Sequence, residues 1–125
     1  MNSKKILIID DDARNTFALS AVLKSRGYTC EISSNMKEAI YLMDNQDDVR
    51  IILMDMMMPE MDGYEAIPVL KGNPSLQHIP VIAVTAQAMT GDREKCLAAG
   101  ADDYLSKPVN VDQLQSILNR YMNEK

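Results

Sequence analysis

The sequence has few of the residues that most often build catalytic and metal sites. It contains one histidine and two cysteines among 125 residues. Two cysteines with no further ligand nearby do not make a zinc site, so we expect Cys30 and Cys96 to be free thiols, at least one of them partly buried. The histidine, His78, falls in a loop-like stretch with no serine or cysteine motif beside it. A surface histidine is therefore expected, not a catalytic one.

Long apolar runs and a basic surface are also missing. No apolar run approaches the roughly 20 residues that span a bilayer. The run that follows the N-terminal lysines is only Ile6–Ile9 and ends in aspartates, so it is not a signal peptide. The formal net charge of -5 argues against a nucleic-acid surface. We expect a cytoplasmic protein of one domain, residues 1–125, with no membrane contact and no direct nucleic-acid contact.

Short apolar runs alternate with helical patterns along the chain. Strands are expected at 5–10, 28–33, 50–55, 80–85 and 102–106. Helices are expected at 13–26, after Asn35, from about Tyr64, from Thr90 or Gly91 to Gly100, and after Asn110. Strict alternation predicts an α/β fold with a parallel sheet, right-handed crossovers and helices on both faces. We expect a flavodoxin-like, doubly wound (βα)5 fold with five parallel strands in the order 2-1-3-4-5.

Two local features refine the helices. Asn35 and Glu38 have the spacing of a capping box. Pro68 falls inside the third predicted helix, where an interior proline removes a hydrogen bond and clashes with the preceding turn. That helix is expected to be kinked, or to begin late enough that Pro68 lies in its first turn.

Polar residues end the apolar runs. Asp10 and Asp11 follow the first run, Asp55 ends the third, Thr85 ends the fourth and Lys107 follows the fifth. Ligands of open parallel sheets bind beyond the carboxyl ends of the strands, and neighbouring strands lie about 4.8 Å apart. Three clustered carboxylates would repel one another unless a cation such as Mg²⁺ joined them. Lys107 could then meet a phosphoryl oxygen near Asp55.

Each of these residues has a plainer explanation when taken alone. The run Asp10–Asp12 could be a turn that caps the first helix, and Asp12 is best interpreted in that way. The methionines around Asp55 indicate packing, not a soft-metal site. The joint placement of Asp10, Asp11, Asp55 and Lys107 at the ends of strands favours a single site.

Four motifs together resemble the receiver domain of bacterial two-component response regulators, from Lys5 to about Met122. In order along the chain they are Ile8–Asp11, Met54–Gly63, Val84–Ala86 and Gly100–Pro108. The resemblance implies that Asp55 accepts a phosphoryl group from a phosphohistidine of a histidine kinase or phosphotransfer protein. It implies that Asp11, Asp55 and the backbone carbonyl of Met57 bind Mg²⁺, and that Asp10 helps through water.

The resemblance also implies a switch. Lys107 would contact the phosphoryl oxygens and Thr85 would swing its hydroxyl toward them. Tyr104 would change rotamer and alter the surface of the fourth helix, fifth strand and fifth helix for a downstream protein. The Lys107–Pro108 bond is expected to be cis. Such a domain is a signalling module, with no enzymatic activity beyond self-catalysed phosphotransfer and slow autodephosphorylation.

In this family, the positions two residues after the phosphoacceptor and the switch threonine tune the access of water. Here they are Met57 and Gln87, and the bulky Met57 predicts a fairly long-lived phosphorylated state. The stretch Gly91–Cys96 is similar to the receivers of hybrid histidine kinases. A free single-domain regulator, favoured by Met1 and by the natural-looking C-terminal end, and a receiver from a hybrid kinase both remain open.

An enzyme is the main alternative, namely a Mg²⁺-dependent aspartyl-phosphate phosphatase of the haloacid dehalogenase type. Asp10 and Asp12 have the spacing of its first motif, with Asp10 as the nucleophile. That motif expects Thr or Val two residues after the second aspartate, where this sequence has Arg14. No cap domain is available either.

Overall fold

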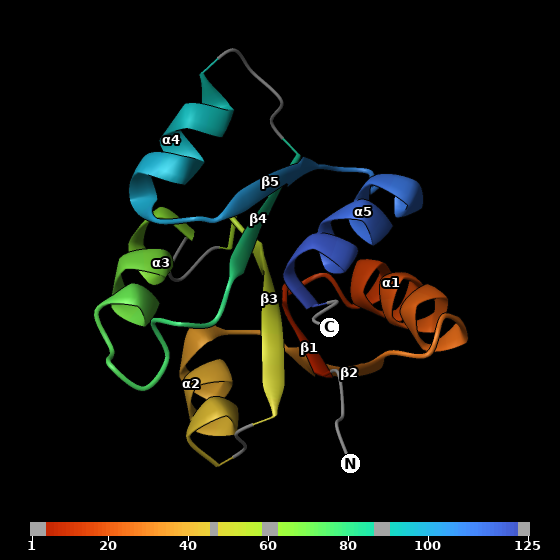
Figure 1. The fold of residues 1–125 in the computed structure, drawn as a ribbon, viewed down its shortest axis with the longest axis horizontal. Coiled ribbons are helices and arrows are strands. Elements are labelled where there is room, and N and C mark those ends of the chain that lie inside the picture. The colour runs from red at the N-terminus through yellow and green to blue at the C-terminus, as the bar shows by residue number, and fades with distance from the viewer. Residues whose placement is uncertain (1–4, 46–47, 59–62, 87–90, 123–125) are drawn as a thin grey trace.

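The computed structural model describes residues 5–45, 48–58, 63–86 and 91–122. Strands and helices alternate within these residues as the sequence predicts (Figure 1). The strands are β1 (Lys5–Ile9), β2 (Thr29–Ser33), β3 (Val49–Asp55), β4 (Val81–Thr85) and β5 (Asp103–Ser106). The helices are α1 (Ala13–Ser25), α2 (Met36–Asn45), α3 (Gly63–Lys71), α4 (Asp92–Ala99) and α5 (Val111–Met122).

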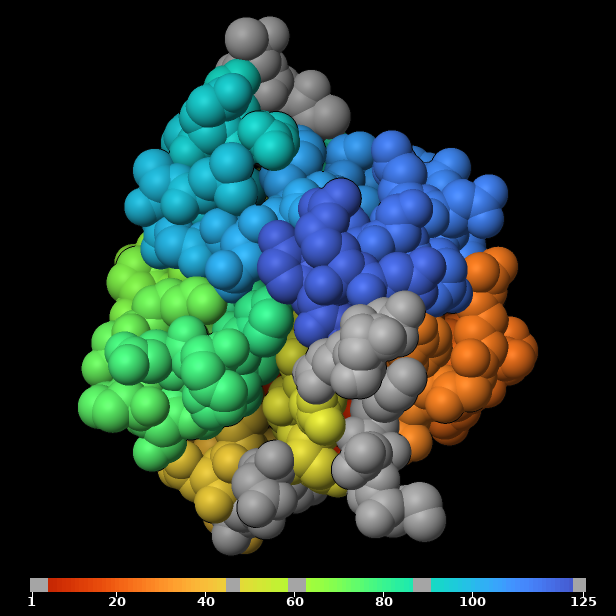
Figure 2. All heavy atoms as spheres, viewed as in Figure 1, coloured from red at the N-terminus to blue at the C-terminus, as the bar shows by residue number. Residues whose placement is uncertain are grey.

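The strands form one parallel sheet in the order β2-β1-β3-β4-β5. This confirms the predicted flavodoxin-like topology and the edge position of β2. Two apolar clusters lie on the two faces of the sheet: Leu7 belongs to the cluster of α2, α3 and α4, and its neighbour Ile8 to that of α1 and α5. Side chains of a strand point alternately to opposite faces of the sheet, and helices cover both faces. Each central strand is therefore apolar on both of its faces. In the space-filling view α3, α4 and α5 form adjoining parts of the surface (Figure 2).

Helix ends follow the capping residues. Asp12 is the N-cap of α1 and accepts hydrogen bonds from the backbone amides of Arg14 (3.1 Å) and Asn15 (3.3 Å), as expected for a cap. Asn110 caps α5 through the amide of Gln113 at 3.0 Å. These caps fix where each helix leaves the carboxyl edge of the sheet.

The capping box predicted for α2 is only half formed. The backbone amide of Glu38 donates to Asn35 Oδ1 at 2.8 Å, as predicted. The returning contact of the Glu38 carboxylate goes to the amide of Ser34 at 3.4 Å and the hydroxyl of Ser33 at 3.3 Å. The hydroxyl of Ser33 lies 3.5 Å from the Asn35 amide and accepts from it, which accounts for the difference.

Helix α3 begins at Gly63 and holds Pro68 in its interior, so the alternative that placed Pro68 in the first turn is wrong. The early start has a local cause. The amide of Gly63 donates to the carbonyl of Met56 at 3.2 Å, and a Cβ at Gly63 would lie 3.0 Å from Met56 Cα. Only glycine lets the helix approach the chain after β3 so closely.

The amino edge of the sheet is held by Lys71. Its ammonium group donates to Asp102 Oδ2 at 2.9 Å and to the carbonyl oxygens of Ile79 at 3.1 Å and Gln77 at 3.4 Å. Asp102 Oδ2 also accepts from the amide of Val81 at 2.8 Å. The end of α3 is thereby joined to the starts of β4 and β5.

The two cysteines and the single histidine lie in the environments that the sequence predicts. Cys30 is half-buried and Cys96 is buried, and both are free thiols. His78 is exposed in a turn. Among the described residues, none of the helices has the length and apolar character needed to cross a membrane.

Candidate functional site

Three carboxylates meet at the carboxyl edge of the sheet. Asp55 ends β3 and Asp10 directly follows β1, its neighbour in the sheet. One carboxylate oxygen each from Asp10, Asp11 and Asp55 lies within 4.8 Å of the others. Asp10 and Asp55 are only 4% and 5% exposed, whereas Asp11 is exposed. The cluster therefore has two buried members and one that faces solvent.

Lys107 supplies an ammonium group to the buried pair. Its Nζ lies 3.2 Å from Asp10 Oδ2 and 3.6 Å from Asp55 Oδ1. The backbone amide of Met57 donates to the same Asp55 oxygen at 3.1 Å. Lys107 follows β5, which lies two strands from β3, so a lysine is long enough to reach both carboxylates.

Hydrogen bonds reach both carboxylate oxygens of Asp10. The backbone amide of Asp12 donates to Oδ1 at 2.9 Å, and Asn15 Nδ2 donates to Oδ2 at 2.9 Å, beside the contact from Lys107. These donors offset the cost of burying a charged group.

The electrostatics of the cluster have opposing causes. Burial raises the pKa of Asp55, the charge of Asp10 raises it further, and the Met57 amide and Lys107 oppose this. Burial alone would lower the pKa of Lys107, but the hydrogen bond and charge of Asp10, together with Asp55, hold that pKa above its usual value. Lys107 is therefore charged at neutral pH. Three carboxylate oxygens this close together are the kind of donor set that a hard divalent cation prefers.

Thr85 and Lys107 are linked through the backbone. Thr85 ends β4 and is almost fully buried, and its carbonyl accepts from the amide of Lys107 at 2.8 Å. The Lys107–Pro108 peptide bond is cis, as predicted. The side chain of Tyr104, on β5, packs against the core cluster of α2, α3 and α4. The sheet thus brings Asp10, Asp55 and Lys107 into contact and leaves Tyr104 farther back along β5.

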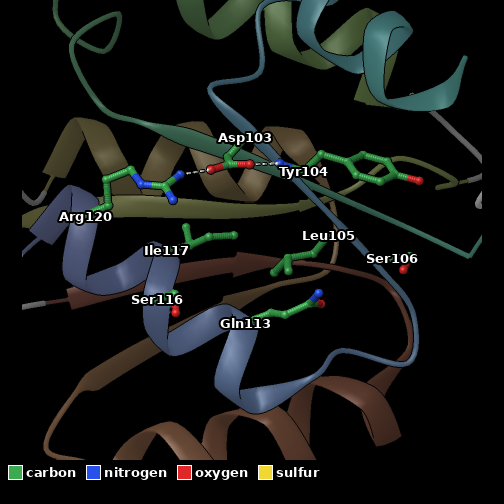
Figure 3. A pocket seen from close by; sticks show the side chains of 8 residues that line it. All are labelled: Asp103, Tyr104, Leu105, Ser106, Gln113, Ser116, Ile117 and Arg120. Atoms are coloured by element: carbon green, nitrogen blue, oxygen red, sulfur yellow. Dashed lines mark hydrogen bonds and ion pairs between the residues drawn. The ribbon is translucent and has the colours of Figure 1, made fainter.

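An open pocket of about 310 Å³ lies between β5 and α5 (Figure 3). It is lined by Asp103, Tyr104, Leu105, Ser106, Gln113, Ser116, Ile117 and Arg120. Arg120 Nη1 lies 2.7 Å from Asp103 Oδ2 at one end of it. The pocket borders the strand that carries Tyr104 and that precedes Lys107.

One contact of the carboxylate cluster, between Asn15 and Asp10, was not predicted from the sequence. Asn15, in the first turn of α1, bonds Asp10, although no motif singled it out. A signal was present, because a side chain at the third helical position reaches back toward the cap. With Asp12 as the cap, that position is Asn15.

Met57 and Gln87 are the two residues predicted to control the access of water. Met57 is 50% exposed beside Asp55. Gln87 lies outside the described residues, as do residues 59–62 of the second motif.

The chain belongs to the response regulator receiver domain family, which matches residues 6–119. It is thus a receiver domain of two-component phosphorelays, a signalling module and not a classical enzyme. The membership confirms the resemblance that the four motifs indicated.

Individual relatives include both long and short proteins. The chain is 38% identical over 116 residues to the signal transduction histidine-protein kinase BarA of Escherichia coli K12, covering 93% of this chain but only 12% of that protein. It is 35% identical over 122 residues to the polar-differentiation response regulator DivK of Brucella anthropi, covering 97% of this chain and 98% of that protein.

One solved structure is similar to this chain in both fold and sequence. The receiver domain of the sensor histidine kinase PA1611 from Pseudomonas aeruginosa PAO1 matches with a TM-score of 0.86 and 36% identity, covering 98% of this chain and 99% of that one. That structure has a magnesium ion coordinated in its active site cleft.

Proposed function

We propose that Asp55 accepts a phosphoryl group from a phosphohistidine of a histidine kinase or histidine phosphotransfer protein. The observation that carries this proposal is the buried carboxylate of Asp55, with the Lys107 ammonium 3.6 Å away and two further carboxylates beside it. Asp11, Asp55 and the backbone carbonyl of Met57 would hold Mg²⁺, with Asp10 contributing through water. The magnesium ion in the related PA1611 receiver supports this choice of cation.

The transfer is balanced without another reactant. A carboxylate oxygen of Asp55 forms a bond to phosphorus, the bond from phosphorus to the histidine nitrogen breaks, and that nitrogen keeps the electron pair. Mg²⁺ would supply positive charge to the phosphoryl oxygens in this site. Lys107 contacts the same oxygens and neutralises charge that spreads onto them. The resulting acyl phosphate is labile and is lost by slow autodephosphorylation.

Phosphorylation acts as a switch if it favours one of two conformations. The hydroxyl of Thr85 turns toward the phosphoryl group, and Tyr104 changes rotamer with it. The surface of α4, β5 and α5, which includes the pocket of Figure 3, changes with Tyr104 and binds a downstream protein. Residues 1–125 form one receiver domain in this proposal.

Phosphorylation by a small donor tests the site. The protein is incubated with Mg²⁺ and acetyl phosphate, and its intact mass is measured. The wild type should gain one phosphoryl group, Asp55→Asn should gain none, and Asp12→Asn, which keeps a side-chain oxygen at the helix cap, should still gain it. Labelling that survives Asp55→Asn but is lost in Asp10→Asn would support the haloacid dehalogenase-type phosphatase instead, as would fast hydrolysis of phosphomonoesters.

A further inference from the structure

Asn15 brings an uncharged donor to the acid cluster. Its Nδ2 lies 2.9 Å from Asp10 Oδ2, the oxygen that Lys107 Nζ also contacts at 3.2 Å. Only the amide nitrogen of Asn15 can face a carboxylate, because the amide oxygen is an acceptor and would oppose lone pairs to lone pairs. The chemistry of Asp10 therefore fixes the orientation of the Asn15 side chain.

The start of α1 fixes the position of Asn15. The backbone amide of Asn15 donates to the cap oxygen, Asp12 Oδ1, at 3.3 Å. The backbone amide of Asp12 in turn donates to Asp10 Oδ1 at 2.9 Å. One short segment thus holds both oxygens of the Asp10 carboxylate, Oδ1 through the backbone and Oδ2 through the Asn15 amide.

The two donors to Asp10 Oδ2 differ in what else they can contact. Lys107 also lies 3.6 Å from Asp55 Oδ1, and in the proposed function it turns to the phosphoryl oxygens. Asn15 is uncharged and stays on α1. We propose that Asn15 is a positioning residue that keeps the Asp10 carboxylate aligned toward the cation, in particular once Lys107 has turned away. This inference rests on the proposed function.

Because Asn15 is uncharged, it holds Asp10 without competing with the cation for that carboxylate. A lysine or arginine there would place a second positive charge on Asp10 and compete with Mg²⁺. An apolar residue would leave Asp10 Oδ2 with Lys107 alone and let the carboxylate rotate. Loss of such an outer partner typically weakens metal binding by 10–100-fold, and we expect about tenfold here, because Asp11 and Asp55 remain.

Binding of Mg²⁺ to the unphosphorylated protein tests the inference by isothermal titration calorimetry. Asn15→Leu keeps the approximate shape and removes the donor, so the Kd for Mg²⁺ should rise about tenfold. Asn119→Leu is the matched control, since Asn119 is exposed on α5 and its side chain accepts from Gln115 Nε2 at 3.1 Å. It should leave the Kd unchanged. The Mg²⁺ midpoint for phosphorylation by acetyl phosphate should shift by the same factor in Asn15→Leu, with the plateau rate restored at saturating Mg²⁺.

A second background tests whether Asn15 acts through Asp10. In Asp10→Asn protein, adding Asn15→Leu should have no further effect on the Kd. An equal loss in both backgrounds would overturn the inference. Asn15→Ala, compared by thermal unfolding without Mg²⁺, serves as the second variant if Asn15→Leu does not fold.

The two proposals fail in different ways. Wild-type protein that takes up no phosphoryl group contradicts the proposed function. Wild-type protein that is phosphorylated on Asp55, with Asn15→Leu and Asn15→Ala both binding Mg²⁺ as tightly as the wild type, overturns only the role of Asn15.

Discussion

The ammonium group of Lys107 lies 3.2 Å from the carboxylate of Asp10. Lys107 also reaches Asp55, so two almost fully buried carboxylates share this cation. Removing one partner of a buried ion pair is costly, because it leaves the remaining charge without compensation.

Lys107→Met should lower the free energy of unfolding at neutral pH by about 1–3 kcal/mol when no divalent cation is present, the lower end reflecting the partial exposure of the lysine. Urea denaturation followed by circular dichroism measures this. Lys37→Met, at an exposed position of α2, is the control and should have little effect. Added Mg²⁺ should restore much of the loss, since it replaces the missing positive charge. Equal stability of Lys107→Met and wild type would contradict the geometry.

Asp55→Asn should make the apo protein more stable at pH 7, by about 1 kcal/mol after allowance for solvent screening. The pKa of Asp55 is raised mainly by burial, so the folded state holds this proton to a higher pH than the unfolded state does. Stability contributed by the protonated form is present below the ordinary aspartate pKa and is lost as the pH rises through the raised value. The neutral amide avoids that loss.

The extra stability of Asp55→Asn over the wild type should therefore shrink as the pH falls. At low pH, Asp55 of the wild type is protonated in both the folded and the unfolded state. Urea unfolding of wild type and variant at several pH values, with a chelator present, measures the difference. Asp44→Asn, at an exposed position of α2, provides the comparison for simple loss of surface charge. A gain in Asp55→Asn that grows toward acid would show that burial does not dominate at Asp55.

Met57→Asn should shorten the lifetime of the phosphorylated protein several-fold. The side chain of Met57 is half-exposed beside Asp55, and asparagine there could hydrogen-bond and orient an attacking water molecule. The decay of phosphorylated protein, followed by intact mass after removal of acetyl phosphate, measures the lifetime. A wild-type half-life of seconds that Met57→Asn does not change would argue against control by this residue.

Gly63→Ala should destabilise the protein by about 1–3 kcal/mol, because the added methyl group overlaps Met56 and the chain after β3 must shift. Thermal or urea unfolding measures this. Val69→Ala, on the exposed side of the same helix, should change stability by no more than about 0.5 kcal/mol. If both variants behaved alike, the close approach of α3 to Met56 would be unimportant.

The sequence predicts the sheet well because its strands are apolar on both faces and end abruptly at polar residues. For that reason the sequence could predict that Asp55 and Lys107 lie close together, since the sheet brings distant strand ends to one edge. The pattern is weaker where one side chain can choose between partners. Glu38 bonds Ser34 and Ser33 instead of returning to Asn35, and spacing alone does not distinguish these acceptable partners.

The position of Pro68 within α3 and the contact of Asn15 with Asp10 are two further features that the sequence pattern does not predict. The start of α3 depends on the contact of Gly63 with Met56, which no helical pattern contains. The bond from Asn15 to Asp10 crosses a helix cap, and an asparagine in a first turn has many other uses. Both depend on how the chain folds back on itself over a few residues.

Lys71 lies at the opposite edge of the sheet from Asp55 and Lys107, where it joins the end of α3 to the residues around β4 and β5. The contacts of Lys71 thus lie at one edge of the sheet, and the carboxylate cluster with Lys107 lies at the other. We expect substitutions among Lys71 and the residues it contacts to change thermal stability more than they change the proposed chemistry at the other edge of the sheet.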